Sequence, residues 1–465
     1  MLFVASALCA QFKNAADFGF LPEKSPAENV KALQAAVDGG GTIVVSKPGV
    51  YGLDDTVKLD SHTKLLFGAD VLIKKVRNKS KPFTYVFINR GAFEKKWNTD
   101  ISIDGLNLSV NGVDHVPAQI FGLIGHVSFF YAKDVKITRF RCFDLMPAQF
   151  CVHVCTFEDL LIDDIAVSGQ KDGVHLGRGK RFKISNGVFK TFDDAIALNA
   201  HDYDGSNPEL GWIEDGVVEN VTDLNAENTT GFFCRILAGS WTDWKQGMEL
   251  QKSDTVVCDG RLYRVIGKPD GKKYISKTRP THKKGIVVVD GIRWNMVQEG
   301  AVYNAGVRNV VFRDIFLYKP RVAFSVHFDD DVWSRSYYPG APFVSQSNLV
   351  FENVHVMYDK KTPFIHTRTP INTIVLQNCF LKNNPIVFHP LARMKDVSKT
   401  FVKMSGCTIS PTQNYNFIVA YEHKAVDFAS VLTNVEGNFK LGAEIDASKC
   451  TINSDFTDGK LAPKK

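Results

Sequence analysis

The stretch SGQKDGVHLGRGKRFKISNGVFKTFDDAIAL, residues 168–198, contains two copies of one short pattern. Aligning KDGVHL with DDAIAL places Asp172 on Asp194, an offset of 22 residues, and makes the apolar positions of both copies coincide. A repeat of this size, rich in β-branched residues and too short for a pair of helices, is typical of one coil of a solenoid. Equivalent residues of successive coils stack at about 4.8 Å. The pattern therefore predicts that Asp172 and Asp194 lie side by side, with Asp193 adjacent.

The same arrangement of a short apolar strand, then Asn, Asp or Gly, then a second short strand recurs along most of the chain. Helical periodicity is nearly absent after the N-terminal segment, which argues against alternating strand–helix units. The sequence therefore predicts an all-β fold, a single-stranded right-handed parallel β-helix. Its coils are expected at residues 100–110, 134–145, 159–169, 181–191, 216–226, 309–318, 348–358, 373–383 and 401–411.

One helix is predicted near the N-terminus. Ser25 and Pro26 suit the N-cap and the first helical position, and Gly39–Gly41 suits the end. The first coil of a solenoid has an open edge and an uncovered core, so this helix is expected to cap it. Its apolar face is formed by Val30, Leu33, Ala36 and Val37.

Residues 247–303 interrupt the coil pattern. This segment alternates like β-hairpins with Asp-Gly turns, and it predicts a small β module inserted into a β-helix domain that spans residues 11–465. Trp294, Tyr263 and Tyr274 are interpreted as the core of the module, with stacking on sugar rings as the alternative.

The first ten residues, MLFVASALCA, form a short apolar run that ends in small residues. They resemble the second half of a secretory signal, which predicts a signal peptide at residues 1–10 and a secreted or periplasmic protein. A truncated start or a short buried strand are the alternatives. Elsewhere no apolar run approaches the roughly 20 residues of a membrane span, so none is expected.

The composition, 44% hydrophobic and 23% charged, is that of an ordinary globular protein. The net charge is +6, but the basic residues are dispersed, so a nucleic-acid partner is not expected. The nine cysteines show no zinc-ligand spacing. They are interpreted mainly as buried apolar side chains, with one or two disulfides left open, and no metal or cofactor is expected.

Three acidic groups within about one coil disfavour joint ionisation and raise at least one pKa. Glycoside hydrolysis needs such a set, because one carboxylic acid must be protonated and another ionised. Asp172 and Asp194 are predicted to share a water as the base, and Asp193 to protonate the leaving oxygen. This division predicts an inverting mechanism, with acid and base roughly 6.5–9.5 Å apart. The alternative is that these residues only cap turns.

The motifs QKDG (170–173) and FDDAIAL (192–198) resemble the NTDG and GDD motifs of glycoside hydrolase family 28, the polygalacturonases, in the pectin-lyase-like right-handed β-helix superfamily. The resemblance covers the cap and the central coils. It implies that Asp172 and Asp194 are the base carboxylates and that Asp193 is the general acid. The family's Gly-His-Gly motif is missing, and Arg235-Ile236-Leu237 only partly matches its Arg-Ile-Lys motif. The resemblance thus implies hydrolysis more than a preference for galacturonate.

Substrate-binding candidates follow from strand parity. If Val174 and Leu176 point inward, His175 points outward, and so do His153 one coil before and Arg235 one coil after. An exposed His–His–Arg strip beside the acids is therefore predicted, with a solvated polar face as the alternative. Further candidates in the following loops and strands are His201, Tyr203, Trp241, Trp244, Arg321 and His327, the last within SVHFDDDVW (325–333).

Three functions are compatible with these observations. The leading hypothesis is a secreted glycoside hydrolase that acts on a complex or acidic polysaccharide. A polysaccharide lyase would use the aspartates to hold Ca²⁺ and an Arg or Lys to abstract a proton. A non-catalytic adhesin or tailspike-like protein would bind carbohydrate without cleaving it.

Overall fold

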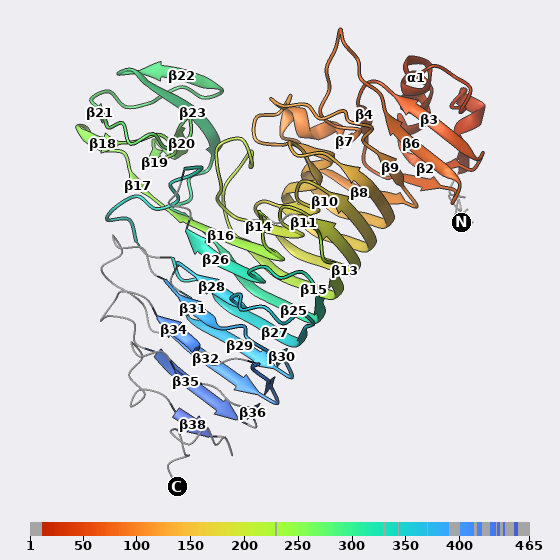
Figure 1. Ribbon diagram of the computed structural model, residues 1–465. Helices are drawn as coiled ribbons and strands as arrows, with labels where there is room; N and C mark the ends of the chain where they lie inside the picture. Colours follow the sequence, from red (N-terminus) through yellow and green to blue (C-terminus); the bar gives the residue numbers. More distant parts are fainter. Residues whose placement is uncertain are drawn as a thin grey trace, which may run out of the picture.

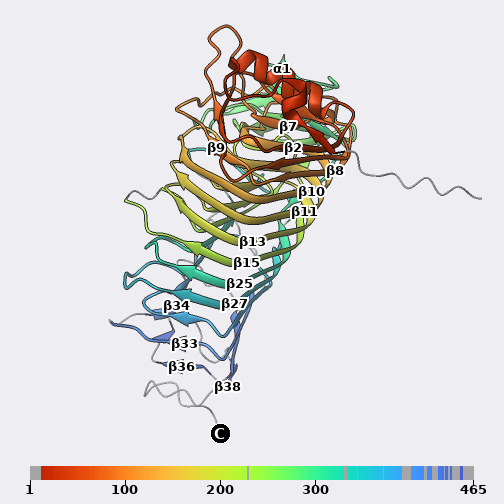
Figure 2. The ribbon, with the colours of Figure 1, turned by 90° about the vertical axis from the view of Figure 1, so that its right-hand side faces the viewer.

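The computed structural model describes most of the chain up to residue 453 and confirms the right-handed parallel β-helix (Figures 1 and 2). The described residues are 12–227, 230–328, 332–342, 344–369, 371–389, 400–412, 416–420, 428–433, 435–437, 440–441 and 451–453. The signal peptide predicted at residues 1–10 lies outside them. In the described part, no helix combines the length and apolar character needed to cross a membrane.

The N-terminal part consists of short elements around one α-helix. They are β1 (Phe12–Asn14), η1 (Ala15–Phe18), α1 (Pro26–Val37), β2 (Gly41–Val45), β3 (Gly49–Leu53), β4 (Val57–Leu59), β5 (Thr63–Phe67), β6 (Val71–Lys75), β7 (Phe87–Asn89), η2 (Arg90–Glu94), β8 (Asn98–Asp104) and β9 (Asn107–Ser109).

The central coils follow, and Figure 2 shows them stacked along one axis. Their strands are β10 (Gly125–Leu145), β11 (Phe150–Gly169), β12 (Val174–Leu176), β13 (Gly179–Thr191), β14 (Ile196–Asn199), β15 (Ile213–Asp223), β16 (Cys234–Ser240), β24 (Asn304–Ala305), β25 (Val307–Leu317), β26 (Phe324–Phe328) and β27 (Ser347–Val356). Later strands are β28 (Ile365–Thr367), β29 (Thr373–Gln377), β30 (Phe380–Leu381), β31 (Ile386–Phe388), β32 (Thr400–Ser405), β33 (Thr408–Ile409), β34 (Asn416–Ala420), β35 (Phe428–Thr433), β36 (Glu436–Gly437), β37 (Lys440–Leu441) and β38 (Thr451–Asn453).

The Asp or Asn between two apolar runs is the corner of each coil. Asp134, Asp159, Asp215 and Asn309 have positive φ values of 51–58°, a left-handed conformation that short polar side chains tolerate best after glycine. Each corner turns the chain so that both flanking strands keep their apolar side chains in the core. The Asn and Asp residues that recur in the sequence pattern therefore mark these corners.

The predicted register is confirmed. Val174 of β12 pairs with Ile196 of β14, and Ile196 pairs with Cys234 of β16. These parallel pairings fix the relative positions of the acidic residues, which directly precede β12 and β14. The 22-residue offset is therefore one coil of the helix.

The cap is also confirmed. Helix α1 begins at Pro26, and Ser25 and Glu28 form a reciprocal capping box. Leu33, Ala36 and Val37 are fully buried against the first coils. In Figure 1 the helix covers the N-terminal end of the stack.

The inserted segment forms two small sheets that project from the coil stack beside β16 (Figure 1). Tyr263 and Trp294 are fully buried in its core, so these two rings are not available for stacking on sugars. The sheets begin earlier than residue 247, because they include β17 (Thr242–Asp243). The strands within the segment are β18 (Met248–Leu250), β19 (Thr255–Cys258), β20 (Arg261–Val265), β21 (Tyr274–Ser276), β22 (Ile286–Val289) and β23 (Ile292–Glu299).

The cysteines of the described residues are buried and form no disulfide, as their interpretation as core side chains requires. They are Cys142, Cys151, Cys155, Cys234, Cys258, Cys379 and Cys407. Cys9 and Cys450 lie outside the described residues.

Candidate active site

A cleft of about 650 Å³ lies over the short strands β16, β26 and β28, beside the acidic residues that precede β14. Five of the predicted site residues line it, namely Asp193, Asp194, Tyr203, Arg235 and His327. The remaining lining residues are Pro147, Gln170, Lys171, Phe192, Thr230, Phe232, Ser325, Trp333, His366 and Arg368.

The structure brings the three predicted catalytic residues together. One carboxylate oxygen from each of Asp172, Asp193 and Asp194 lies within 4.8 Å of the other two. Asp172 and Asp194 are buried, whereas the side chain of Asp193 is 23% exposed. The predicted separation of 6.5–9.5 Å is therefore wrong, because adjacent coils bring the carboxylates closer than that spacing. The distance no longer supports a prediction of inversion.

Asp194 is a buried carboxyl group at the base of the cleft. Its Oδ1 accepts a hydrogen bond from the backbone N–H of Phe232 at 2.8 Å. Gly231 makes this approach possible, since a Cβ there would lie 2.5 Å from backbone atoms of Asp193 and Asp194. Burial, followed by the charges of Asp172 and Asp193, raises the pKa of Asp194 well above its usual value. The surroundings of Asp194 thus favour its protonated form.

Asp172 is buried next to Asp193 and Asp194 and does not line the cleft. Its Oδ2 and Nδ1 of His175 share a hydrogen bond of 2.9 Å. Burial raises the pKa of Asp172 to about 8, and burial lowers that of His175 to about 3. The pair is therefore a neutral carboxylic acid beside a neutral imidazole at pH 7.

Lys171 is a candidate functional residue that the sequence analysis did not name. Its ammonium forms an ion pair with Oδ2 of Asp193 and lies 3.8 Å from Oδ1 of Asp172. Burial alone would raise the pKa of Asp193, but the charge and hydrogen bond of Lys171, together with Arg235, outweigh burial and lower it. The 22-residue offset that aligns Asp172 with Asp194 also aligns Lys171 with Asp193, so the sequence did contain a signal for this contact.

The predicted division of roles is therefore reversed. We predicted a protonated Asp193 and an ionised Asp172–Asp194 pair. The pKa of Asp193 is lowered, whereas those of Asp172 and Asp194 are raised. The physical reason is Lys171, because its positive charge lies against Asp193 and so stabilises the ionised form of that carboxylate.

The three carboxylates resemble the oxygen-donor set of a divalent cation site. However, the ammonium of Lys171 already lies against Asp193 and near Asp172. A bound Ca²⁺ would meet this positive charge at close range, which is unfavourable. The donor set therefore does not fit a metal while Lys171 is in place, and no step is assigned to one.

Protonation of Asp172 has a consequence for stability. An unfolded Asp has a pKa of about 3.9, so the folded chain keeps a proton on Asp172 that the unfolded chain releases between pH 4 and 8. The folded state binds more protons in this window, so the free energy of unfolding falls as pH rises from about 4 to about 8. Asp172→Asn is expected to flatten this decline in thermal or urea unfolding. The half-exposed Asp134→Asn should leave the decline unchanged.

The exposed histidine strip predicted from parity is wrong. The register stacks His153, His175, Ala197 and Arg235 on successive coils, so Arg235 lies two coils beyond His175. Both histidines are fully buried, and the ring of His175 stacks on Phe150 at 4.0 Å. Parity places these side chains outside the solenoid core, but loops cover them, and only Arg235 reaches the cleft.

Three other candidates lie away from the cleft. His201 is buried, with its ring 5.6 Å from that of Trp241. Trp241 is 1% exposed and donates from Nε1 to the carbonyl of Val302 at 2.5 Å. Trp244 donates from Nε1 to Oγ of Ser276 within the inserted module. His201 and Trp241 lie where the chain leaves the coils for the module, Trp244 lies within the module, and none of the three lines the cleft.

The inserted module is attached to one wall of the cleft. Tyr203 and Trp333 both line the cleft, with ring centroids 6.2 Å apart. From the module, Nζ of Lys268 lies 3.4 Å from the ring centre of Trp333. The N–H of Gly267 donates to Oδ2 of Asp204, next to Tyr203, at 2.7 Å. The module therefore supports the two aromatic side chains on this wall of the cleft.

Later coils supply basic and polar lining. His327 shares a hydrogen bond of 2.8 Å with Ser325, and Ser325 pairs in register with His366. Burial, with positive neighbours, lowers the pKa of His366 to about 4. Arg368 lines the same wall. Sequence reasoning named only His327 here, although the coil register would have aligned the others. The three acidic residues 329–331, which follow His327 closely in the sequence, lie outside the described residues.

Arg321 is a positioning residue and does not line the cleft. It donates to both carboxylate oxygens of Asp223, at 3.0 and 2.7 Å, and to the backbone carbonyl of Asp193 at 2.7 Å. The ion pair is buried, so Arg321→Met is expected to cost about 3–5 kcal/mol in urea unfolding. The exposed pair of Arg313 with Glu219 gives the matched control, since Arg313→Met should cost about 1 kcal/mol or less.

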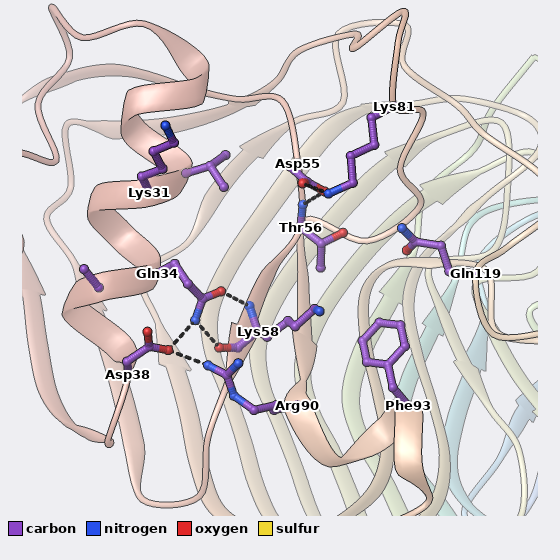
Figure 3. Close-up of a pocket in the computed structure, with 12 residues that line it drawn as sticks. Lys31, Gln34, Asp38, Asp55, Thr56, Lys58, Lys81, Arg90, Phe93 and Gln119 are labelled. Carbon is purple, nitrogen blue, oxygen red and sulfur yellow. Dashed lines mark hydrogen bonds and ion pairs between the residues drawn. The ribbon is translucent and has the colours of Figure 1, made fainter.

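A second cleft of about 660 Å³ lies between the cap helix and the first coils (Figure 3). Its polar side chains bind one another. Gln34 donates to Asp38 at 2.8 Å and to the carbonyl of Lys58 at 2.9 Å, and Arg90 forms an ion pair with Asp38. These contacts attach the cap to the coils and include no cluster of catalytic groups.

The chain is similar to several solved structures, all at low sequence identity. No family model matches the chain, and no curated protein matches its sequence. A family 28 exopolygalacturonase of Yersinia enterocolitica aligns with 92% of this chain and 79% of its own, at 14% identity and a TM-score of 0.48. The tailspike protein of E. coli bacteriophage HK620, solved with a pentasaccharide, aligns with 95% of this chain and 80% of its own, at 9% identity and a TM-score of 0.48.

The surface adhesin PfbA of Streptococcus pneumoniae is similar to the same extent. It aligns with 94% of this chain and 94% of its own, at 13% identity and a TM-score of 0.44. A polygalacturonase, a tailspike and an adhesin are thus all similar to this chain at low identity. The comparisons assign none of these activities to it, and membership of family 28 stays a prediction from the motifs.

Proposed function

We propose that this protein is a glycoside hydrolase that cleaves a complex, acidic polysaccharide. One observation carries the proposal. Asp193 and Asp194 border the same cleft, and their pKa values are shifted in opposite directions. Hydrolysis of a glycosidic bond needs one protonated and one ionised carboxyl group at the reacting atoms.

Each carboxyl group then has a defined role. Protonated Asp194 donates its proton to the glycosidic oxygen as the bond to the anomeric carbon breaks. The Asp193 carboxylate accepts a proton from the attacking water, whose hydroxyl joins the anomeric carbon. A proton then returns from Asp193 to Asp194, whose oxygens are close enough for transfer through one water. Lys171 keeps Asp193 ionised between turnovers.

The walls of the cleft suit an acidic sugar chain. Tyr203, Phe232 and Trp333 supply aromatic surface for sugar rings. Arg235 and Arg368 supply guanidinium groups, which bind carboxylates and sulfates well. A polysaccharide of this kind lies outside the cell, which accords with the signal peptide proposed at residues 1–10. N-terminal sequencing of the exported protein tests whether residues 1–10 are removed.

The test is product release from a panel of neutral and acidic polysaccharides, with and without EDTA. We expect new reducing ends, no unsaturated uronate products and no effect of EDTA. Unsaturated products lost with EDTA would mean a lyase, and binding without product release would mean a non-catalytic receptor; either result overturns the proposal. NMR of the first product anomer then separates attack by water from direct attack by Asp193.

A further inference from the structure

Strand β22 presents an exposed apolar surface outside the cleft. Ile286, Val287 and Val288 are 43%, 39% and 62% exposed. The strand lies at the end of the five-stranded sheet, which has the order β17-β19-β20-β23-β22, and among the described residues it pairs with β23 alone. Figure 1 shows it at the outer end of the inserted module. Consecutive β-branched residues on an open edge are a template for pairing with another strand.

The free hydrogen-bonding groups of this edge can be assigned. The carbonyl of Gly285 accepts a hydrogen bond from the N–H of Met296 in β23 at 3.0 Å. Because backbone groups alternate along an antiparallel strand, the N–H and C=O of Val287 also face β23. Those of Ile286 and Val288 therefore face outward, and none of them is used within the module.

The strand is complementary to itself. It runs Lys284-Gly-Ile-Val-Val-Val-Asp290, with a cation before the apolar run and an anion after it. An antiparallel copy centred on Val287 would place Ile286 opposite Val288, and it would bring the Lys284 end of each strand beside the Asp290 end of the other. In this register the outward groups of Ile286 and Val288 meet as hydrogen-bonded pairs. Asp290 accepts hydrogen bonds from the backbone N–H groups of Thr278 and Lys277, and these lower its pKa, which favours the charged form.

The geometry points to self-association of the chain, with β22 of one copy pairing antiparallel with β22 of a second copy. The interface is a two-fold one in which the same surface is used by both copies. It joins two five-stranded sheets into one. An apolar edge of four residues buries less than a standard interface of about 1,600 Å². We therefore expect a weak, concentration-dependent dimer with a dissociation constant in the micromolar range.

Sedimentation of the full chain over about 1–100 µM tests this pairing. Wild type should shift from monomer to dimer, whereas Val288→Lys should remain monomeric because each copy brings a charge into the apolar run. Val188→Lys is the matched control, since Val188 is 41% exposed on β13 of the coils; it should dimerise like wild type. Lys284→Glu should weaken the dimer about threefold or more, since both ion pairs become repulsive.

Hydrogen exchange supplies a residue-level check. The amides of Ile286 and Val288 should be protected at high protein concentration and exchange quickly at low concentration, while that of Val287 should be slow at both. A wild-type monomer throughout this range overturns the inference. So does association that survives Val288→Lys, or a monomer that instead captures another protein through β22.

Discussion

Replacing Lys171 by methionine is expected to reduce glycoside cleavage at pH 7 by about 100-fold. The side chain of Lys171 is 18% exposed, and its ammonium contacts Asp193 and lies 3.8 Å from Asp172. Without it, three carboxyl groups share one small volume, so the pKa of Asp193 should rise. Because activity needs Asp193 ionised, the acidic limb of the kcat/KM profile should move to higher pH. The measurement is this pH profile on any substrate found by the polysaccharide panel.

Two further variants interpret the result. Lys171→Arg keeps the positive charge and should restore most of the activity and the wild-type profile. Lys180→Met removes an exposed lysine that pairs with Glu158 on the coil surface and should change nothing. If Lys171→Met retains the wild-type profile, Lys171 does not control the ionisation of Asp193 and our division of roles fails.

Replacing Asp193 by asparagine is expected to lower kcat by at least about 1,000-fold. The amide cannot accept the proton of the attacking water. Among the described residues that line the cleft, the only other carboxyl group is that of Asp194, which serves as the acid. The thermal midpoint should stay close to that of wild type, because Asp193 is partly exposed and its side chain fills no core position. Asp134→Asn, at a half-exposed corner, should keep full activity.

A substrate with an activated leaving group separates the two roles. Asp194→Asn should also be inactive on the polysaccharide, but an aryl glycoside whose leaving group needs no proton should restore cleavage by this variant. The same substrate should not rescue Asp193→Asn. If the aryl glycoside rescues only Asp193→Asn, then Asp193 is the acid and Asp194 belongs to the base, as the motifs predict. A large loss of stability in either variant would mark the acids as structural.

Much of the architecture followed from local sequence rules. The corner residues, such as Asp159 and Asn309, follow from backbone conformation, and the helix cap follows from Ser25 and Pro26. The register followed from one repeat, because shifting it would have turned apolar side chains such as Val174 out of the core. These features depend on residues that are close in sequence or one coil apart. Sequence patterns report on interactions over these short separations.

The site was harder to predict because it depends on side-chain environment. Parity placed His153 and His175 outside the core, but it cannot reveal that Phe150 and nearby loops cover them. The motifs located Asp193 and Asp194, yet their protonation depends on Lys171, whose effect needs its position in space. The wall formed by His366 and Arg368 comes from coils beyond the region where the motifs were recognised.

The most direct test of the central claim is a pH titration of the aspartate carboxyl carbons by ¹³C NMR, without substrate. All proteins are labelled at aspartate. The signal of Asp193 is the one missing from the Asp193→Asn spectrum, and the signal of Asp194 is the one missing from the Asp194→Asn spectrum. We expect the pKa of Asp193 to lie below that of an ordinary aspartate and the pKa of Asp194 to lie well above it, with Lys171→Met raising the pKa of Asp193. If Asp193 is protonated at neutral pH while Asp194 is ionised, the account of this site is contradicted.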